Sequence, residues 1–142
     1  MESAFLGLIL DSSVVIEAER KGQAVEQFLE SIRQSFGEVA IALCSVTVAE
    51  LVHGVYRANL PEIRQRRRAF IDELKRHVPV HPVTEATGEI MGKISGEQAA
   101  QGIKIPFDDL AIGASALEQN YGVAIRNLRH FEKIPGLTIH QP

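Results

Sequence analysis

The stretch Phe5-Leu-Gly-Leu-Ile-Leu-Asp-Ser-Ser13 decides the fold of this chain of 142 residues. Its apolar run continues without interruption from Phe5 to Leu10 and stops at Asp11. Such a run is typical of a strand covered on both faces in a parallel sheet, because an exposed face would place polar residues at every second position. Asp11 therefore falls at the edge where parallel α/β sheets bind their ligands.

The rest of the chain alternates strand-like and helical patterns. Five segments have the apolar pattern of strands: 5–10, 39–44, 78–83 (an edge strand, because it holds two prolines), 123–125 and 137–139. Helical spacing fills the segments between them: 12–35 with a break near Gly22, 48–56, 61–74, 84–101 and the almost wholly apolar 110–117. This alternation predicts a single α/β domain over residues 1–142, with a mainly parallel central sheet flanked by helices.

Composition narrows the class of protein further. The formal net charge is −3, so nucleic-acid binding cannot depend on bulk charge, but residues 57–77 hold seven basic and only three acidic side chains. The single cysteine, Cys44, excludes an internal disulfide. The apolar run before Asp11 is too short to span a bilayer, so we expect a soluble, cytoplasmic protein without a membrane partner.

Acidic side chains follow several of the predicted strands. Asp11 follows the first, Glu50 lies early in the helix after the second, and Asp108 and Asp109 open the apolar helix. Because the carboxyl ends of parallel strands share one edge of a sheet, we expect these carboxylates to converge. Oxygen ligands of this kind suit Mg²⁺ or Mn²⁺, and the chemistry such a site supports is metal-assisted hydrolysis.

Each acid also has a purely structural interpretation. Thr47-x-x-Glu50 has the spacing of a capping box, and Asp108 is a natural N-cap of the helix that follows it. The negative charge of Asp109 at the start of its helix can simply interact favourably with the helix macrodipole. Asp11, Ser12 or Ser13 can each cap the first helix. These roles do not explain why all the acids follow strands.

The chain resembles a known family, the PIN-domain ribonucleases, and most closely the VapC-like toxins of type II toxin–antitoxin pairs. Four stretches carry the resemblance: Leu8-Ile-Leu-Asp-Ser-Ser-Val-Val-Ile16, Ser45-Val-Thr-Val-Ala-Glu-Leu-Val-His-Gly54, Ile105-Pro-Phe-Asp-Asp-Leu-Ala-Ile-Gly-Ala114 and Arg126-Asn-Leu-Arg-His-Phe-Glu-Lys-Ile-Pro-Gly-Leu137. They occur in the family's order and run from the first predicted strand to the last.

The resemblance implies roles for individual residues. Asp11, Glu50 and Asp109 match the family's metal-binding and catalytic acids, although Asp108 stands beside Asp109. Asn127 occupies the place of a fourth acid or of an Asn that orients water and metal, and His130 lies close enough in sequence to contact substrate. The hydroxyl residue usual before this last motif is replaced by Ile125, so a polar contact to the site is missing.

The resemblance also implies an endoribonuclease that depends on Mg²⁺ or Mn²⁺ and acts on an RNA substrate as the toxin of its pair. It implies a homodimer and a small antitoxin protein, which often inserts an arginine among the acids. The basic run around Arg66, Arg67 and Arg68 is a candidate grip on RNA phosphates.

Two alternatives remain open from the sequence. The first is a catalytically weak or inactive PIN-like protein that binds RNA or regulates, which retention of Asp11, Glu50 and Asp109 disfavours. The second is a receiver-like phosphoacceptor, which requires a lysine near the acids after the last strand; the lysine available is Lys133, beyond Phe131.

Overall fold

The computed structural model describes residues 6–126 and 130–142. Its strands are β1 (Gly7–Leu10), β2 (Ala40–Cys44), β3 (Val80–His81), β4 (Gly122–Ala124) and β5 (Ile139–His140). Its helices are α1 (Ser12–Arg20), α2 (Val25–Phe36), α3 (Ser45–Arg57), α4 (Pro61–His77), α5 (Glu85–Ala99) and α6 (Phe107–Gln119), with a short 3₁₀ helix η1 (Phe131–Lys133).

The five strands form one sheet in the order β3-β2-β1-β4-β5, and every neighbouring pair is parallel. The predicted α/β architecture is therefore confirmed, including the position of the proline-bounded strand at an edge. The break near Gly22 separates α1 from α2, as predicted. The last strand begins at Ile139, two residues later than the pattern predicted.

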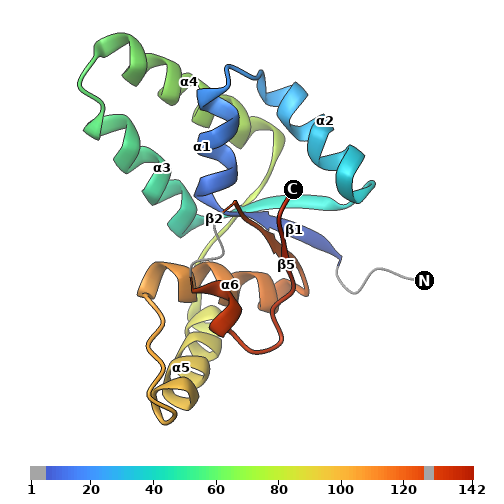
Figure 1. Cartoon of the computed structure of the whole chain (residues 1–142), viewed down its shortest axis with the longest axis vertical. Coiled ribbons are helices and arrows are strands. Elements are labelled where there is room, and N and C mark those ends of the chain that lie inside the picture. Colours follow the sequence, from blue (N-terminus) through green and yellow to red (C-terminus); the bar gives the residue numbers. More distant parts are fainter. Residues whose placement is uncertain (1–5, 127–129) are drawn as a thin grey trace.

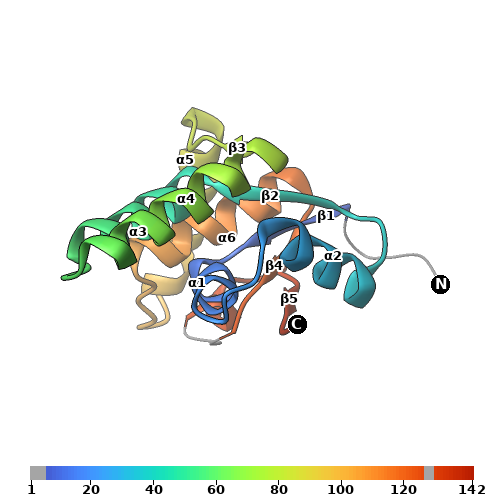
Figure 2. The same cartoon turned by 90° about the horizontal axis from the view of Figure 1, so that it is seen from above.

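The sheet is covered on both faces, as the unbroken apolar run of β1 requires (Figure 1). Leu8 and Leu10 pack into a core with α1, α2 and α4, whereas Ile9 between them packs into a second core with α5 and α6. Figure 2 shows the paired helices α3 and α4 projecting beyond the strands. Since β1 is central, Asp11 emerges in the middle of the carboxyl edge.

Gly7 lies where β1 and β2 come closest together. A Cβ atom on Gly7 would stand 2.6 Å from the carbonyl oxygen of Ala40 and 2.8 Å from the Tyr121 ring. Ala40 is also the register partner of Gly7 across the two strands, so only a glycine fits this position without moving the backbone.

Two helix starts differ from the prediction. α3 begins at Ser45 with Cys44 as its N-cap, so Thr47 is buried inside the helix and the Thr47–Glu50 capping box is wrong. α6 begins at Phe107 with Pro106 as its N-cap, so Asp108 is not a cap either. In both cases the helix starts earlier, and the acids are left available for other contacts. Among the described residues, no helix is both long and apolar enough to cross a membrane.

Candidate functional site

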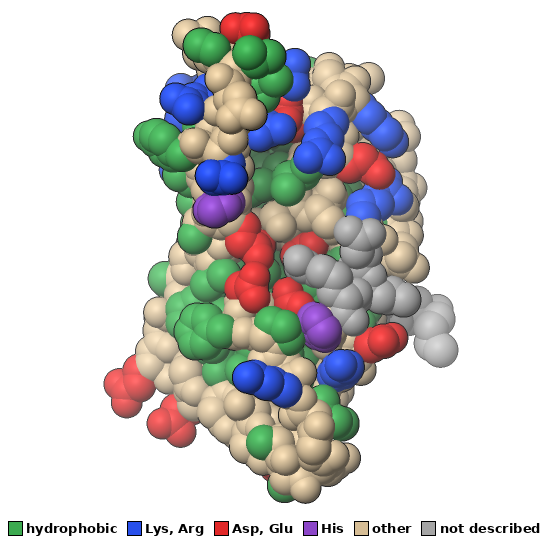
Figure 3. All heavy atoms as spheres, turned by 60° about the vertical axis from the view of Figure 1, so that its left-hand side comes forward, with side chains coloured by type: hydrophobic (Ala, Val, Ile, Leu, Met, Phe, Trp, Pro, Cys, Tyr) green, Lys and Arg blue, Asp and Glu red, His purple; other side chains and the backbone are tan. Residues whose placement is uncertain are grey.

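Four carboxyl groups come from three helices that begin at the carboxyl edge of the sheet. Asp11 is the N-cap of α1, Glu50 lies in the second turn of α3, and Asp108 and Asp109 lie in the first turn of α6. Figure 3 shows Asp and Glu side chains gathered in the middle of one face, with Lys and Arg side chains mostly above them. The predicted convergence of Asp11 with Glu50 and the start of α6 is thus present.

Asp11 is fully buried and its orientation is fixed by Ser13. Its Oδ2 accepts hydrogen bonds from the Ser13 backbone N–H at 3.1 Å and from the Ser13 hydroxyl at 2.6 Å. The same hydroxyl accepts a hydrogen bond from the backbone N–H of Arg126 at 3.0 Å. A chain of hydrogen bonds therefore runs from the exit of β4 through Ser13 to Asp11.

The sequence interpretation considered Ser13 only as an alternative cap and missed this role. The signal was present in the pattern Asp-Ser-Ser, since a hydroxyl two residues after an N-cap aspartate can reach its carboxylate. Ile125, where a hydroxyl was expected, is buried in the apolar core instead. Ser13, in the first turn of the helix that follows β1, thus provides a hydroxyl beside Asp11 in place of the one missing after β4.

Glu50 is the carboxyl group most perturbed by its surroundings. Burial raises its pKa to about 7, with a further contribution from a hydrogen bond with Asp108 and from the charges of Asp11 and Asp108. The Ser12 hydroxyl opposes this rise by hydrogen bonding to the carboxylate. Its Oε1 is buried and has no hydrogen-bond partner among the described residues. When it is protonated, Glu50 donates a hydrogen bond to Asp108, and this bond contributes to the raised pKa.

Asp108 and Asp109 occupy different environments. Asp108 is half-buried and contacts Glu50, whereas Asp109, the next residue, is 2% exposed. The negative charges of both side chains interact favourably with the positive N-terminal end of α6. The structure therefore adds Asp108 to the three acids that the sequence resemblance singled out.

The acids are not arranged around a common point. In residues 6–126 and 130–142, no group of three or more His, Cys, Asp or Glu side chains is positioned to hold a metal ion. Ser13 engages one oxygen of Asp11, and Glu50 is hydrogen-bonded to Asp108. All four groups are nevertheless hard oxygen donors, the kind that Mg²⁺ and Mn²⁺ prefer.

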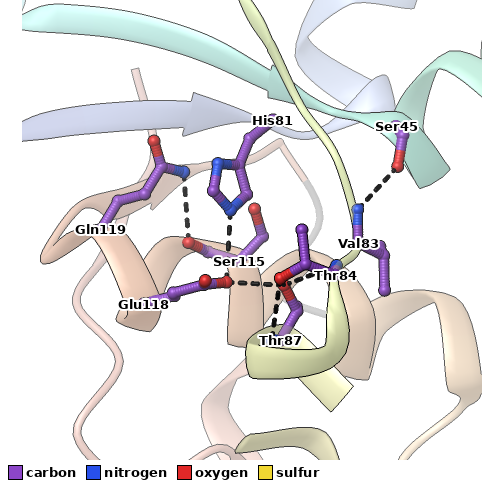
Figure 4. Close-up of polar contacts among 8 residues, drawn as sticks. All are labelled: Ser45, His81, Val83, Thr84, Thr87, Ser115, Glu118 and Gln119. Atoms are coloured by element: carbon purple, nitrogen blue, oxygen red, sulfur yellow. Dashed lines mark hydrogen bonds and ion pairs between the residues drawn. The ribbon is translucent and has the colours of Figure 1, made fainter.

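A polar cluster behind the site holds α3, α5 and α6 together (Figure 4). The Thr87 hydroxyl donates to Glu118 Oε1 at 2.6 Å, and His81 Nε2 lies 3.2 Å from the same oxygen. The Thr87 hydroxyl, followed by His81, lowers the pKa of Glu118. Ser45, the first residue of α3, accepts from the Val83 N–H at 3.3 Å. These contacts hold the start of α3, which carries Glu50, and the C-terminal end of α6, the helix that begins with Asp108 and Asp109.

The three arginines expected to hold RNA make contacts within the fold. Arg66 Nε donates to Glu19 Oε2 at 2.5 Å, and Arg67 lies 3.6 Å from Glu19 Oε1 while donating to the Gly54 carbonyl at 2.8 Å. Arg68 instead pairs with Asp72 at 2.9 Å on its own helix. RNA binding by these side chains stays a prediction, but each of them already forms an ion pair with an acid of the fold.

Replacing Arg67 by Ala should destabilise the protein more than replacing Arg68 by Ala. Glu19 is 6% exposed, so losing Arg67 leaves a buried carboxylate with one partner fewer, at a cost of about 1–3 kcal/mol. The Arg68–Asp72 pair is solvent-exposed, and such pairs contribute little to stability. Thermal unfolding of the two variants measures the difference, and equal melting temperatures would contradict this role of Glu19.

The remaining predicted residues lie near the end of the chain. Asn127 lies outside the described residues, so its role stays a prediction. His130 is half-buried before η1, and its Nδ1 is buried without a hydrogen-bond partner among the described residues. A substrate contact by His130 also stays a prediction.

Comparison with known proteins gives consistent results. The family model for the PIN domain matches residues 8–137. The chain is 28% identical to "Ribonuclease VapC1" of Rickettsia felis, over 94% of this chain and 95% of that protein. It is also 28% identical to "tRNA(fMet)-specific endonuclease VapC" of Shigella flexneri, over 93% of this chain and 95% of the relative.

Two solved structures resemble the fold closely. The crystal structure of VapBC2 from Rickettsia felis, bound to a promoter DNA fragment, matches with a TM-score of 0.78 at 20% identity, over 93% of this chain and 96% of that one. The structure of VapBC-1 from nontypeable Haemophilus influenzae matches with a TM-score of 0.75 at 25% identity, over 94% and 96% of the two chains.

Proposed function

The chain belongs to the PIN domain family, and on that basis we propose that it is an endoribonuclease acting as the toxin of a toxin–antitoxin pair. The ribonuclease and tRNA endonuclease named above as relatives each align with more than nine-tenths of it, which supports hydrolysis of phosphodiester bonds in RNA. The observation that carries the proposal is the cluster of Asp11, Glu50 and Asp108, with the adjacent Asp109, at the carboxyl edge of the sheet.

We assign Asp11, Glu50 and Asp109, with Asp108 beside them, to bind Mg²⁺ or Mn²⁺. The fit rests on the donor set and on Glu50, whose raised pKa and buried Oε1 mark a position that lacks a positive charge. When bound, the cation supplies charge neutralisation at the scissile phosphate and makes an attacking water more acidic.

The protein's own residues orient this chemistry. Ser13 holds Asp11 in one orientation, and Asp108 accepts a hydrogen bond from Glu50 when Glu50 is protonated. We propose that Asn127 and His130 act from the same edge, on the ground of their place in the family motif.

We also propose that a small antitoxin protein inhibits the site and that the toxin forms a homodimer. The VapBC structures that resemble this chain are titled as toxin–antitoxin complexes or named VapBC, which supports a protein partner of this kind. An apolar cavity with about 460 Å³ of empty space lies between α1, α3 and α4 and reaches Glu50. A partner segment seated there would place an arginine among the acids, where a guanidinium replaces the cation.

Cleavage of total cellular RNA by the purified protein tests the function. With Mg²⁺ or Mn²⁺ we expect discrete new 5′ ends, detected by sequencing, that disappear with EDTA and in the Asp11→Asn variant. Asp108→Asn and Asp109→Asn, compared side by side, show which acid of the pair the reaction needs; we expect the larger loss for Asp109. Cuts that persist in EDTA and in all three variants would contradict the assigned site. An absence of cuts with either metal would favour a binding-only PIN domain.

A further inference from the structure

We propose that an open hollow along α1 binds the phosphate backbone of the RNA strand, with Arg20, Lys21 and Arg126 as its phosphate contacts. This inference rests on the proposed ribonuclease function and names the surface on which its substrate lies. The hollow has about 1100 Å³ of open space, and Ile16 is the one apolar side chain among the residues lining it in the described part of the chain.

The hollow begins at the acidic site. Ser12 and Ser13 line its floor, and these are the hydroxyls that contact Glu50 and Asp11 respectively. Arg20 and Lys21 stand at the opposite end of α1, about 13 Å away at the helical rise per residue. A strand lying in the hollow therefore leads directly to the acids.

The charge of the hollow is positive although the whole protein is acidic. Among the described residues that line the hollow, Arg20, Lys21 and Arg126 face a single acid, Glu17, which lies 2.7 Å from Arg126 Nε and 3.5 Å from Lys21 Nζ. Arg126 is held further by its donation to the Pro142 carbonyl. Glu17 thus positions two cations and leaves a net charge of about +2, the arrangement that attracts a phosphate chain.

Arg20 is the cation best placed to receive a phosphate. It is exposed, it makes no ion pair with any residue in the described parts of the chain, and it lines both the hollow and the apolar cavity beside it. Arg66 and Arg67, which the sequence favoured, are instead engaged with Glu19. Arg20 therefore has a guanidinium group without an acidic partner among the described residues, whereas Arg66 and Arg67 do not.

The chemistry of the hollow favours RNA over a protein segment. The adjacent cavity is lined by Val15, Leu51, Phe70 and Ile71, which suit the apolar side chains of a protein partner. The hollow offers hydroxyls, guanidinium groups and an ammonium group, which are donors for phosphate oxygens. Figure 3 shows such basic side chains bordering the acidic centre.

RNA binding measured without cleavage tests this surface. The probe is a fluorescein-labelled single-stranded RNA, titrated with Asp109→Asn protein in Mg²⁺ over a series of salt concentrations. Adding Arg20→Ala and Lys21→Ala should weaken binding about tenfold at low salt and reduce the slope of log K against log salt by about 1.4, the loss of two phosphate contacts. The matched control adds Arg76→Ala and Lys93→Ala, an exposed Arg and Lys on α4 and α5, and should change affinity less than about twofold.

A variant that is expected to strengthen RNA binding separates an effect on binding from an effect on folding. Glu17→Gln removes the one acid of the hollow, so RNA should bind about threefold more tightly. A purely structural role of Glu17 predicts weaker binding instead, and that result would overturn the inference.

Equal affinities for the Arg20/Lys21 variant and its control would also overturn the inference, while RNA cleavage by the wild type would leave the proposed function standing. If the Arg20/Lys21 variant keeps its RNA affinity but loses an acidic peptide that the parent binds, the hollow serves a protein partner. Failure of the Asp109→Asn protein to bind RNA together with failure of the wild type to cleave would end both proposals.

Discussion

A Glu50→Gln variant should unfold at a higher temperature than the wild type in EDTA at pH 8, yet cleave RNA at least about 100-fold more slowly. The two effects have one origin, because the carboxylate that the proposed cation needs is the group that its surroundings disfavour. Gln keeps the size of Glu and can donate a hydrogen bond to Asp108, but it carries no charge.

The sign of the stability effect follows from proton linkage. The pKa of Glu50 is raised from 4.5 to about 7 in the fold, so the folded state holds the proton more tightly than the unfolded chain. The stability contributed by this proton is complete below about pH 4.5 and is lost as the pH rises through about 7. Allowing for the solvent that reaches this half-buried group, the loss is about 1–2 kcal/mol, or roughly 3–8 °C in Tm.

Thermal unfolding between pH 4.5 and 8 measures this effect. The wild type should lose stability over that range relative to Glu50→Gln, and added Mn²⁺ should restore stability to the wild type alone. Glu89→Gln, which changes an exposed carboxylate in the middle of α5, is the matched control and should follow the wild type. A Glu50→Gln variant that melts below the wild type at pH 8 without metal would contradict the description of this site.

The second large effect is expected at Gly7. A Gly7→Ala variant should lose about 3 kcal/mol of unfolding free energy and roughly 10 °C in Tm. The added methyl group would meet the Ala40 carbonyl at 2.6 Å, and this backbone atom cannot move away without disturbing the pairing of β1 with β2. Denaturant unfolding monitored by circular dichroism gives the value.

Gly92→Ala is the control for this substitution. Gly92 lies in the middle of α5, and a Cβ atom there meets nothing within 4 Å. The change should stabilise the protein by about 0.5–1 kcal/mol, because Ala favours a helix over Gly. If both variants were equally stable, close approach of the two strands would not be the reason for glycine at position 7.

Local patterns in the sequence predicted the sheet and the position of the site. The apolar run 5–10 predicted a strand covered on both faces, and its Gly7–Leu10 part forms one, so the acid directly after it lies at the carboxyl edge. The family resemblance added the roles of the acids, which spacing alone leaves open between capping and metal binding.

Contacts between distant segments were beyond the sequence. The ion pair between Glu19 and Arg66 joins residues 47 apart, and nothing in either helix indicates that the acid is buried. The capping interpretations of Thr47 and Asp108 were wrong because α3 already begins at Ser45 and α6 at Phe107. Both residues therefore lie inside their helices and not at the N-cap. The choice between Asp108 and Asp109 depends on how α6 is rotated against α3, which local spacing does not determine.

The strand order also determines when the acidic site is assembled during synthesis of the chain. β1 leaves the ribosome before its neighbour β4, and the Ser13 hydroxyl can accept from the Arg126 N–H only after a further 113 residues have been made. Pairings this distant in sequence form late, after the long intervening segment is complete. A nascent chain therefore carries Asp11 and Glu50 on an unfinished sheet until β4 has been made.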